Sequence, residues 1–276
     1  MLSESKLGAT RPASGALVGN RFEIALTRDP REIALAQRLR YQVFYEEMDA
    51  TPTPAMAAMR RDFDEFDDLC DHLIVYDRGR PALQQVVGTY RLLPQRVAER
   101  HGGFYSASEY DLSPLLREMA AAGGLLELGR SCVHAGYRTS ATIQLLWRGI
   151  AAYMADNEIT YMFGCASLAG TDPDKLALPL SYLYQHHLAP PEVRVRALPH
   201  RHVPMNRMAG DGIAPRAAIA ALPPLIKAYL RIGAWIGDGA VVDSQFGTTD
   251  VFILLPVNRI AAKYQYHYDA VPGGHG

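Results

Sequence analysis

The sequence predicts an α/β fold with a mixed, mostly antiparallel sheet flanked by helices and an α-rich C-terminal extension. An alternating segment at 22–27 comes before a helical one, and two apolar runs at 72–77 and 86–93 are joined by a turn-rich link. Strand-like, helical and strand-like segments then follow one another between 125 and 168. A hairpin makes antiparallel neighbours, whereas a strand–helix–strand crossover makes parallel ones. The sheet is therefore expected to be mixed.

The first helix is expected over 30–48, directly after the strand at 22–27. A proline suits the first turn of a helix, and the TPTP segment at 51–54 ends this one. Its apolar residues recur at helical spacing: Ile33, Ala36, Leu39, Val43 and Phe44.

The later elements are predicted from turn residues, caps and periodicity. Strands are expected at 72–77, 86–93, 125–134, 159–168 and 251–256. Helices are expected at 139–157, with Thr139 or Ser140 as N-cap, at 175–188 and at 223–236. We expect a flexible tail at 1–20, a core at 21–170, and an extension at 171–276 that packs on the core.

The chain has 276 residues, of which 28 are Lys or Arg and 29 are Asp or Glu, and its net charge is −1. This balance is typical of a globular protein and excludes one that coats nucleic acid over its whole surface. The charge is nevertheless uneven, with six acids against two arginines at 60–71 and five arginines against two acids at 190–216. Such segments are either solvated faces or parts of a site or partner surface.

The three cysteines have no spacing typical of a zinc site or a disulfide framework, so no metal is expected. The N-terminus lacks the apolar region of a signal peptide, and no uncharged apolar run reaches about 18 residues. We therefore expect a cytoplasmic protein. The helix at 223–236 could make a peripheral contact with the inner face of the membrane, although packing on the core is the favoured alternative.

Two charged pairs are candidates for chemistry. Asp64 and Asp67 lie three residues apart on an expected turn, where both carboxylates can reach one cation. Glu127 and Arg130 lie in an otherwise apolar strand, where a charge is costly unless it is paired or functional. Burial raises the pKa of a glutamate, which suits a base that takes a proton from an ammonium group. The alternative is a structural ion pair with Arg91 or Asp64.

The segment at 134–142 joins a strand to a helix, whose free backbone N–H groups suit an anion such as a phosphate. Gly136 permits close approach there, and Arg138 adds a positive charge. Neither a GxSxG turn nor a Walker or GxGxxG loop is present.

Four segments together resemble the acyl-homoserine-lactone (autoinducer) synthases, which have the GNAT N-acyltransferase fold. They are LRYQVF (39–44), DEFD (64–67), GTYRLL (88–93) and ELGRS (127–131). The tryptophan that this family carries after the first helix is absent, and the chain continues about a hundred residues past the common core. Longer segments, including RYQVFYEEMDA and ELGRSCVHAGYR, resemble the bacterial ornithine N-acyltransferases of aminolipid synthesis over most of 22–260, which accounts for both departures.

This second resemblance implies transfer of a 3-hydroxyacyl group from acyl carrier protein to the α-amine of ornithine, with glutamine or glycine as other possible acceptors. It implies that Glu127 deprotonates the acceptor and that Arg130 holds Glu127 or the acceptor carboxylate. Asp64 and Asp67 would hold the cationic part of the acceptor, with Arg91 and Arg40 as neighbouring charges. A backbone N–H at Ser131, Cys132 or Val133 would stabilise the oxyanion. A covalent role for Cys132 is the rival interpretation.

The donor site is expected to extend over Gly136, Arg138, Thr139 and Ser140. Residues 133–138 match the usual coenzyme A pyrophosphate loop only at Gly136, so acyl carrier protein, with its phosphopantetheine thioester, is favoured over acyl-CoA and no bound cofactor is expected. Arg194, Arg196 and Arg201 in the basic loop would dock the acidic carrier. The alternatives are an autoinducer synthase and a non-catalytic protein that binds acyl carrier protein.

Overall fold

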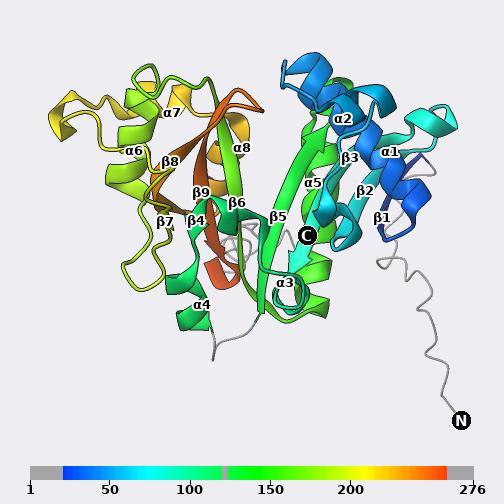
Figure 1. Ribbon diagram of the computed structural model, residues 1–276, viewed down its shortest axis with the longest axis horizontal. Helices are drawn as coiled ribbons and strands as arrows, with labels where there is room; N and C mark the ends of the chain where they lie inside the picture. The colour runs from blue at the N-terminus through cyan, green and yellow to red at the C-terminus, as the bar shows by residue number, and fades with distance from the viewer. Residues whose placement is uncertain (1–20, 120–123, 260–276) are drawn as a thin grey trace, which may run out of the picture. The chain divides into compact units, whose positions relative to one another are not determined.

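The computed structural model describes residues 21–119 and 124–259 (Figure 1), so the predicted tail at 1–20 and the last residues, 260–276, lie outside the described part. The described chain divides into two units. The first comprises 21–48, 52–92 and 130–156, and the second comprises 49–51, 93–129 and 157–259.

The first unit is built on three antiparallel strands in the order β1, β2, β3. These are β1 (Phe22–Thr27), the fully buried β2 (Asp71–Asp77) and β3 (Val86–Pro94). The predicted hairpin between the second and third strands is thereby confirmed. The end of β5 (Gly124–Val133) also belongs to this unit, and the N–H of His134 just after it donates to Val87 O at 2.9 Å.

The first unit has two main helices, α1 (Pro30–Tyr41) and α5 (Ser140–Asp156). The side chain of Asp29 caps α1, which continues as a π-helical turn over Gln42–Glu47, so the predicted helix at 30–48 is confirmed. The Thr139 side chain accepts from Thr142 N at the start of α5, as the sequence predicts. A buried apolar cluster joins α1 to the sheet through Leu39, Val43, Ile74, Tyr76 and Cys132.

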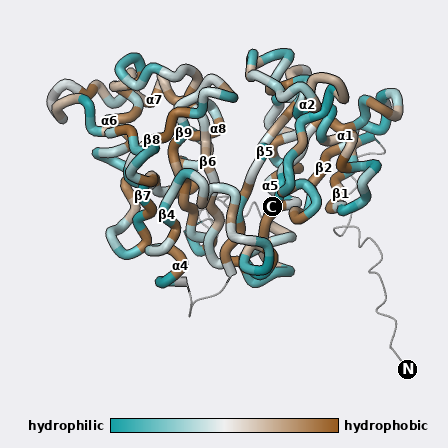
Figure 2. Tube along the Cα trace, viewed as in Figure 1, coloured by the Kyte–Doolittle hydropathy of each residue, from teal (hydrophilic) through white to brown (hydrophobic). Residues whose placement is uncertain are grey.

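The second unit contains the strand order β5, β6, β9, β8, β7, β4. Its strands are β6 (Ile159–Ala169), β9 (Thr248–Pro256), β8 (Trp235–Asp243), β7 (Arg196–Ala197) and β4 (Tyr110–Asp111). β5 and β6 are parallel, as the strand–helix–strand order predicts, whereas β9 is antiparallel to both β6 and β8. Figure 2 shows hydrophobic colouring along β9, and every residue of this strand is buried.

The helix predicted over 223–236 is wrong at its C-terminal end. α8 covers Pro224–Arg231, Gly233 has φ +92°, and Trp235 already begins β8. Glycine adopts this left-handed conformation without steric cost, so it ends the helix and turns the chain into a strand. α8 buries Ile226 and Tyr229, which favours packing within its unit over membrane contact.

The remaining helices are short. In the first unit they are α2 (Pro54–Met59) and the 3₁₀ turns Glu65–Asp68, Ala82–Gln84 and Ala135–Tyr137. In the second they are α3 (Gln95–Ala98), η4 (Tyr105–Ser108), α4 (Ser113–Met119), α6 (Ala177–His187), η6 (Gly210–Gly212) and α7 (Pro215–Ala221). The predicted boundary at 170 lies inside the second unit. Within the described residues, no helix is long and apolar enough to cross a membrane.

Gly164 sets how closely β6 approaches β5. The register of the two strands runs from Gly124↔Ile159 to Glu127↔Phe163, one residue short of Gly164. A Cβ at Gly164 would lie only 2.3 Å from the carbonyl oxygen of Leu128. Because that atom belongs to the backbone, β5 and β6 would have to move apart directly after their last register pair, Glu127 and Phe163.

Replacing Gly164 with alanine is therefore expected to destabilise the protein by about 1–3 kcal/mol, the usual cost of overpacking. Urea unfolding at equilibrium would measure the loss. The control is Gly212→Ala, because a Cβ there meets nothing closer than Met208 Cε at 3.8 Å. Equal unfolding midpoints for the two variants would show that the close approach is not a constraint.

Candidate active site

In the first unit, a buried network of acids and arginines surrounds Arg40, whose side chain is completely buried. Arg40 Nε lies 2.7 Å from Asp62 Oδ2, and its Nη2 lies 2.8 Å from Asp67 Oδ2. Tyr45 donates its hydroxyl to the other oxygen of Asp62 at 2.9 Å. Burying an isolated charge costs several kcal/mol, so these partners are what permits a charge at this position of α1.

Asp64 and Asp67 form a reciprocal capping box on the 3₁₀ turn Glu65–Asp68, which brings both carboxylates toward β3. Arg91 of β3 pairs with Asp64, and its Nη1 lies 3.6 Å from Asp67 Oδ1. The two acids differ in access, because 18% of the Asp64 side chain is exposed and only 4% of that of Asp67.

Arg130 joins the same network from the end of β5. Its Nη2 lies 3.1 Å from Asp64 Oδ2, and its Nε lies 3.3 Å from Asp62 Oδ2. Arg130 has φ +49°, a left-handed conformation that is uncommon for a residue with a side chain. Such a conformation costs about 1–3 kcal/mol and is frequent at functional sites. It also breaks the strict alternation of side chains that an ordinary strand would impose.

The charges of this network shift the pKa values of its members. Burial by itself raises the pKa of Asp67, but the positive charges of Arg40 and Arg91 outweigh it, so the net pKa lies below the usual value. Burial lowers the pKa of His72, whose Nε2 lies 2.9 Å from the carbonyl oxygen of Asp67. At neutral pH Asp67 is therefore ionised and His72 is neutral.

The predicted donor segment lies at the end of β5 and the start of α5. Ser131 and Val133 are half-buried, whereas Gly136, Thr139 and Ser140 are exposed. Arg138 is exposed, and it donates through Nε to Val133 O at 3.2 Å and pairs with Glu47. The strand-to-helix turn is thus open to solvent, as a phosphate site would require.

Cys132 is buried, and its thiol contacts Leu39 O at 3.9 Å. Burial raises the pKa of this thiol far above its usual value. A catalytic thiolate needs the opposite, because electropositive and accessible surroundings lower a thiol pKa. The geometry therefore disfavours the covalent alternative.

In the second unit, Glu127 is held by two consecutive backbone amides. Tyr105 N donates to its Oε2 and Ser106 N to its Oε1, each at 2.8 Å. Only 4% of Glu127 is exposed. Backbone N–H donors favour the ionised form of a buried carboxylate and fix its orientation.

Further titratable groups of the second unit lie beside Cys165 of β6. Glu109 accepts from the Cys165 thiol at 3.5 Å and from Arg201 at 3.2 Å. Burial raises the pKa of Cys165 well above its usual value, helped by the charges of Glu109, Asp250 and Glu127. Burial also raises the pKa of Asp250 of β9 to about 6, against a hydrogen bond from Thr248. Sequence reasoning missed these residues, because acids scattered along the chain carry no spacing signal.

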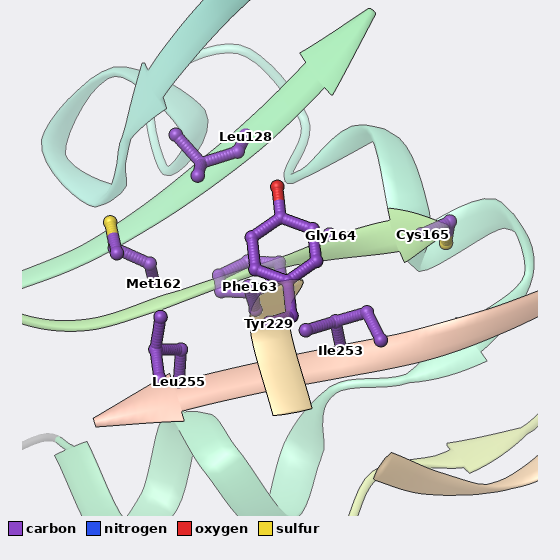
Figure 3. Close-up of a pocket in the computed structure, with 8 residues that line it drawn as sticks. All are labelled: Leu128, Met162, Phe163, Gly164, Cys165, Tyr229, Ile253 and Leu255. Carbon is purple, nitrogen blue, oxygen red and sulfur yellow. The ribbon is translucent and has the colours of Figure 1, made fainter. Parts of the chain in front are cut away.

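A small, partly open pocket lies in the second unit between β5, β6, β9 and α8 (Figure 3). The Tyr229 hydroxyl projects toward Leu128, and Cys165 stands at one end. The other lining residues are Met162, Phe163, Gly164, Ile253 and Leu255. The wall is mostly apolar.

The three arginines predicted to dock a carrier protein differ in their bonding. Arg194 donates through Nε to Ala189 O at 2.7 Å, and Arg201 is tied to Glu109. The Arg196 side chain is 66% exposed, with Nε 3.4 Å from Asp238 Oδ2.

Among the described residues, no group of three or more His, Cys, Asp or Glu side chains is placed to hold a metal ion.

Replacing Arg40 with methionine is expected to lower the free energy of unfolding by about 3–5 kcal/mol, because Asp62 and Asp67 would keep buried charges without their partner. The folded-state pKa of Asp67 is depressed, so its contribution is present above the unfolded pKa and is lost as the pH falls through the folded one. The difference between variant and wild type should therefore shrink below about pH 4.

Urea titrations at pH 7 and pH 3.5 would measure both effects. Arg31→Met, on the same helix but exposed, is the matched control. A loss no larger than that of the control at pH 7 would contradict the structural role of Arg40.

The chain is similar to several known proteins. Residues 39–148 match the family model described as an acetyltransferase (GNAT) domain, which confirms the predicted fold class. The structure of an N-acyl amino acid synthase from uncultured soil microbes has a TM-score of 0.48 and 10% identity, and the match covers 88% of this chain and 94% of that one.

Two named relatives are much closer in sequence. The L-ornithine N(alpha)-acyltransferase of Brucella abortus (strain 2308) is 48% identical over 251 residues, which cover 90% of this chain and 89% of that protein. The protein of the same name from Rhizobium meliloti (strain 1021) is 47% identical over 266 residues, covering 95% and 89%. The acid–arginine network and the buried glutamate of β5 thus belong to an N-acyltransferase scaffold, and the chain is a member of the L-ornithine N(alpha)-acyltransferase family.

Proposed function

We propose that this protein transfers a 3-hydroxyacyl group from acyl carrier protein to the α-amine of ornithine and so forms a lyso-ornithine lipid. The choice of ornithine as the acceptor rests on the 44–48% identity to four relatives that bear the name L-ornithine N(alpha)-acyltransferase. In this reaction the acceptor nitrogen attacks the thioester carbonyl, the carbon–sulfur bond breaks, and the pantetheine thiol leaves. The nitrogen must first lose a proton, because an ammonium group has no lone pair.

Glu127 is the proposed base, acting on the acceptor ammonium directly or through a water molecule. Its burial and its two backbone donors keep a negative charge in one orientation. Proton transfer by a positioned group contributes about 10²–10⁴-fold to a rate. A backbone N–H at Ser131, Cys132 or Val133 is the proposed donor to the oxyanion.

The acceptor contacts are assigned by exposure. Asp64 and Arg130 keep 18% and 13% of their side chains exposed, so they are the members of the network able to meet a substrate. Asp64 would hold a cationic group and Arg130 a carboxylate, for which a guanidinium provides paired donors. Arg40, Arg91 and Asp67 are each at most 4% exposed, and they hold these two in place.

The donor is proposed to be acyl carrier protein rather than acyl-CoA. Gly136, Arg138, Thr139 and Ser140 are exposed at the turn that leads into α5, and one phosphate of a pantetheine arm would bind at the N-terminus of that helix. Arg196 is the most exposed of the three docking arginines. This donor would place the reaction in the cytoplasm.

Replacing Glu127 with glutamine keeps the size of the side chain and removes the base. We expect kcat to fall by about 10²–10⁴-fold with 3-hydroxyacyl carrier protein and ornithine. Mass spectrometry of the product would measure the rate. With glutamine and glycine offered in parallel, the same method would show which amino acid is acylated.

Glu118→Gln, on the exposed face of α4, is the control and should keep wild-type turnover. Full activity of the Glu127 variant would exclude it as the base. If the main product came from another amino acid, the proposal that ornithine is the acceptor would be wrong.

Reversing the charge at Arg194 or Arg196 should raise the KM for acyl carrier protein several-fold and leave the KM for ornithine unchanged, because rim charges act mainly on association. Arg196→Glu should have the larger effect. Initial rates at varied carrier concentration would measure it, with Lys175→Glu outside the loop as the matched reversal. If the loop variants behave like this control, the carrier docks elsewhere.

A further inference from the structure

The two amides that hold Glu127 come from a segment well separated from it in sequence. They belong to Tyr105 and Ser106, the first two residues of η4, and each donates to a different carboxylate oxygen. With both oxygens engaged, the carboxylate can neither rotate nor turn one oxygen away.

Burial and hydrogen bonding act on this carboxyl in opposite directions. A carboxyl that is only 4% exposed is pushed toward its neutral form, because the protein interior solvates a charge poorly. Two donated N–H groups favour the ionised form. A protonated glutamate cannot take a proton, so the balance decides whether Glu127 is competent at neutral pH.

The segment that carries the amides is anchored at both ends. The Phe104 ring meets the Phe163 ring edge-on, with 4.9 Å between their centroids, and Phe163 is the register partner of Glu127 on β6. At the other end, Glu109 O accepts from Leu198 N at 2.8 Å, and the Tyr110 hydroxyl donates to Asp250 O at 3.1 Å. The amides therefore have a defined position relative to β6.

We infer that Tyr105 and Ser106 are positioning residues, whose backbone N–H groups hold Glu127 ionised and oriented for removal of the acceptor proton. This inference rests on the proposed function for the role of Glu127, but the hydrogen bonds themselves can be tested without any substrate. Of the titratable groups described in the second unit, Cys165 on β6 interacts electrostatically with Glu127, and Glu109, which pairs with Arg201, accepts from the Cys165 thiol. Glu109 and Asp250 act on Cys165, as Glu127 does.

Tyr105 offers an unusually clean test, because proline can replace it without breaking the helical turn. It is the first residue of η4, where an N–H has no partner within the turn and proline is tolerated. The preceding residue, Phe104, has φ −83° and ψ 154°, the conformation that a residue before proline prefers. Tyr105→Pro therefore deletes one donor to Glu127, and Tyr105→Ala is the matched control that loses the ring but keeps the donor.

The direct readout is the amide proton of Ser106 in ¹H–¹⁵N spectra followed from pH 4 to pH 9. This proton reports the ionisation of Glu127 in wild type and in both Tyr105 variants, and its titration should vanish in Glu127→Gln. In Tyr105→Pro we expect the midpoint to rise by about one to two pH units, the effect of losing one charge-assisted hydrogen bond. Tyr105→Ala should keep the wild-type midpoint.

The kinetic readout is the acid limb of kcat/KM against pH. In Tyr105→Pro it should move upward by the same amount, so that part of the lost rate returns at higher pH. A merely structural defect would lower the rate by one factor at every pH. A shift of the midpoint without a shift of the limb would contradict the inference.

An unchanged midpoint in Tyr105→Pro would overturn the inference while leaving the proposed function intact. Full turnover of Glu127→Gln would instead overturn the role of Glu127, whatever the midpoints show. If Tyr105→Pro does not fold, hydrogen exchange of wild type decides: amides of Tyr105 and Ser106 that exchange as fast as exposed ones would rule the hydrogen bonds out.

Discussion

The ion pairs of Arg40 are the constraint on which the first unit depends. A fully buried guanidinium in the last turn of α1 is tolerable only while Asp62 and Asp67 pair with it. Asp67 also closes the capping box of its turn, and the same box orients Asp64 toward Arg91. The buried charge of Arg40 thus fixes the position of the acidic turn against β3 and the end of β5. The positions of the more exposed Asp64 and Arg130 depend on this arrangement.

The two units stabilise their buried carboxylates in different ways. Asp62 and Asp67 are neutralised by arginines, which makes them good supports and poor candidates for chemistry. Two backbone amides donate to Glu127, and they orient its carboxylate without themselves carrying a charge. The contrast lies in these partners and not in burial, because all three acids are almost completely buried.

Periodicity predicted most elements correctly, because apolar spacing and turn residues act locally. The strand at 22–27, the hairpin and the parallel pair around α5 all agree with the structure. The error at 223–236 arose because Trp235 and Ile236 continue the apolar pattern of α8, whereas the conformation of Gly233 ends the helix. β8 went unpredicted for the same reason: an apolar run is ambiguous between helix and strand until its neighbours are known.

The sequence by itself determined the family, the fold class and the charged residues that stand out in apolar surroundings. Glu127, Arg130 and the acidic turn were visible because a charge within or beside an apolar strand is unexpected wherever it occurs. Only the tertiary structure decided which groups each of these charged side chains contacts. Neither the two amides at Tyr105 and Ser106 nor the arginine partners of Asp67 could be found from spacing, because contacts between residues more than 20 apart depend on how the strands pack.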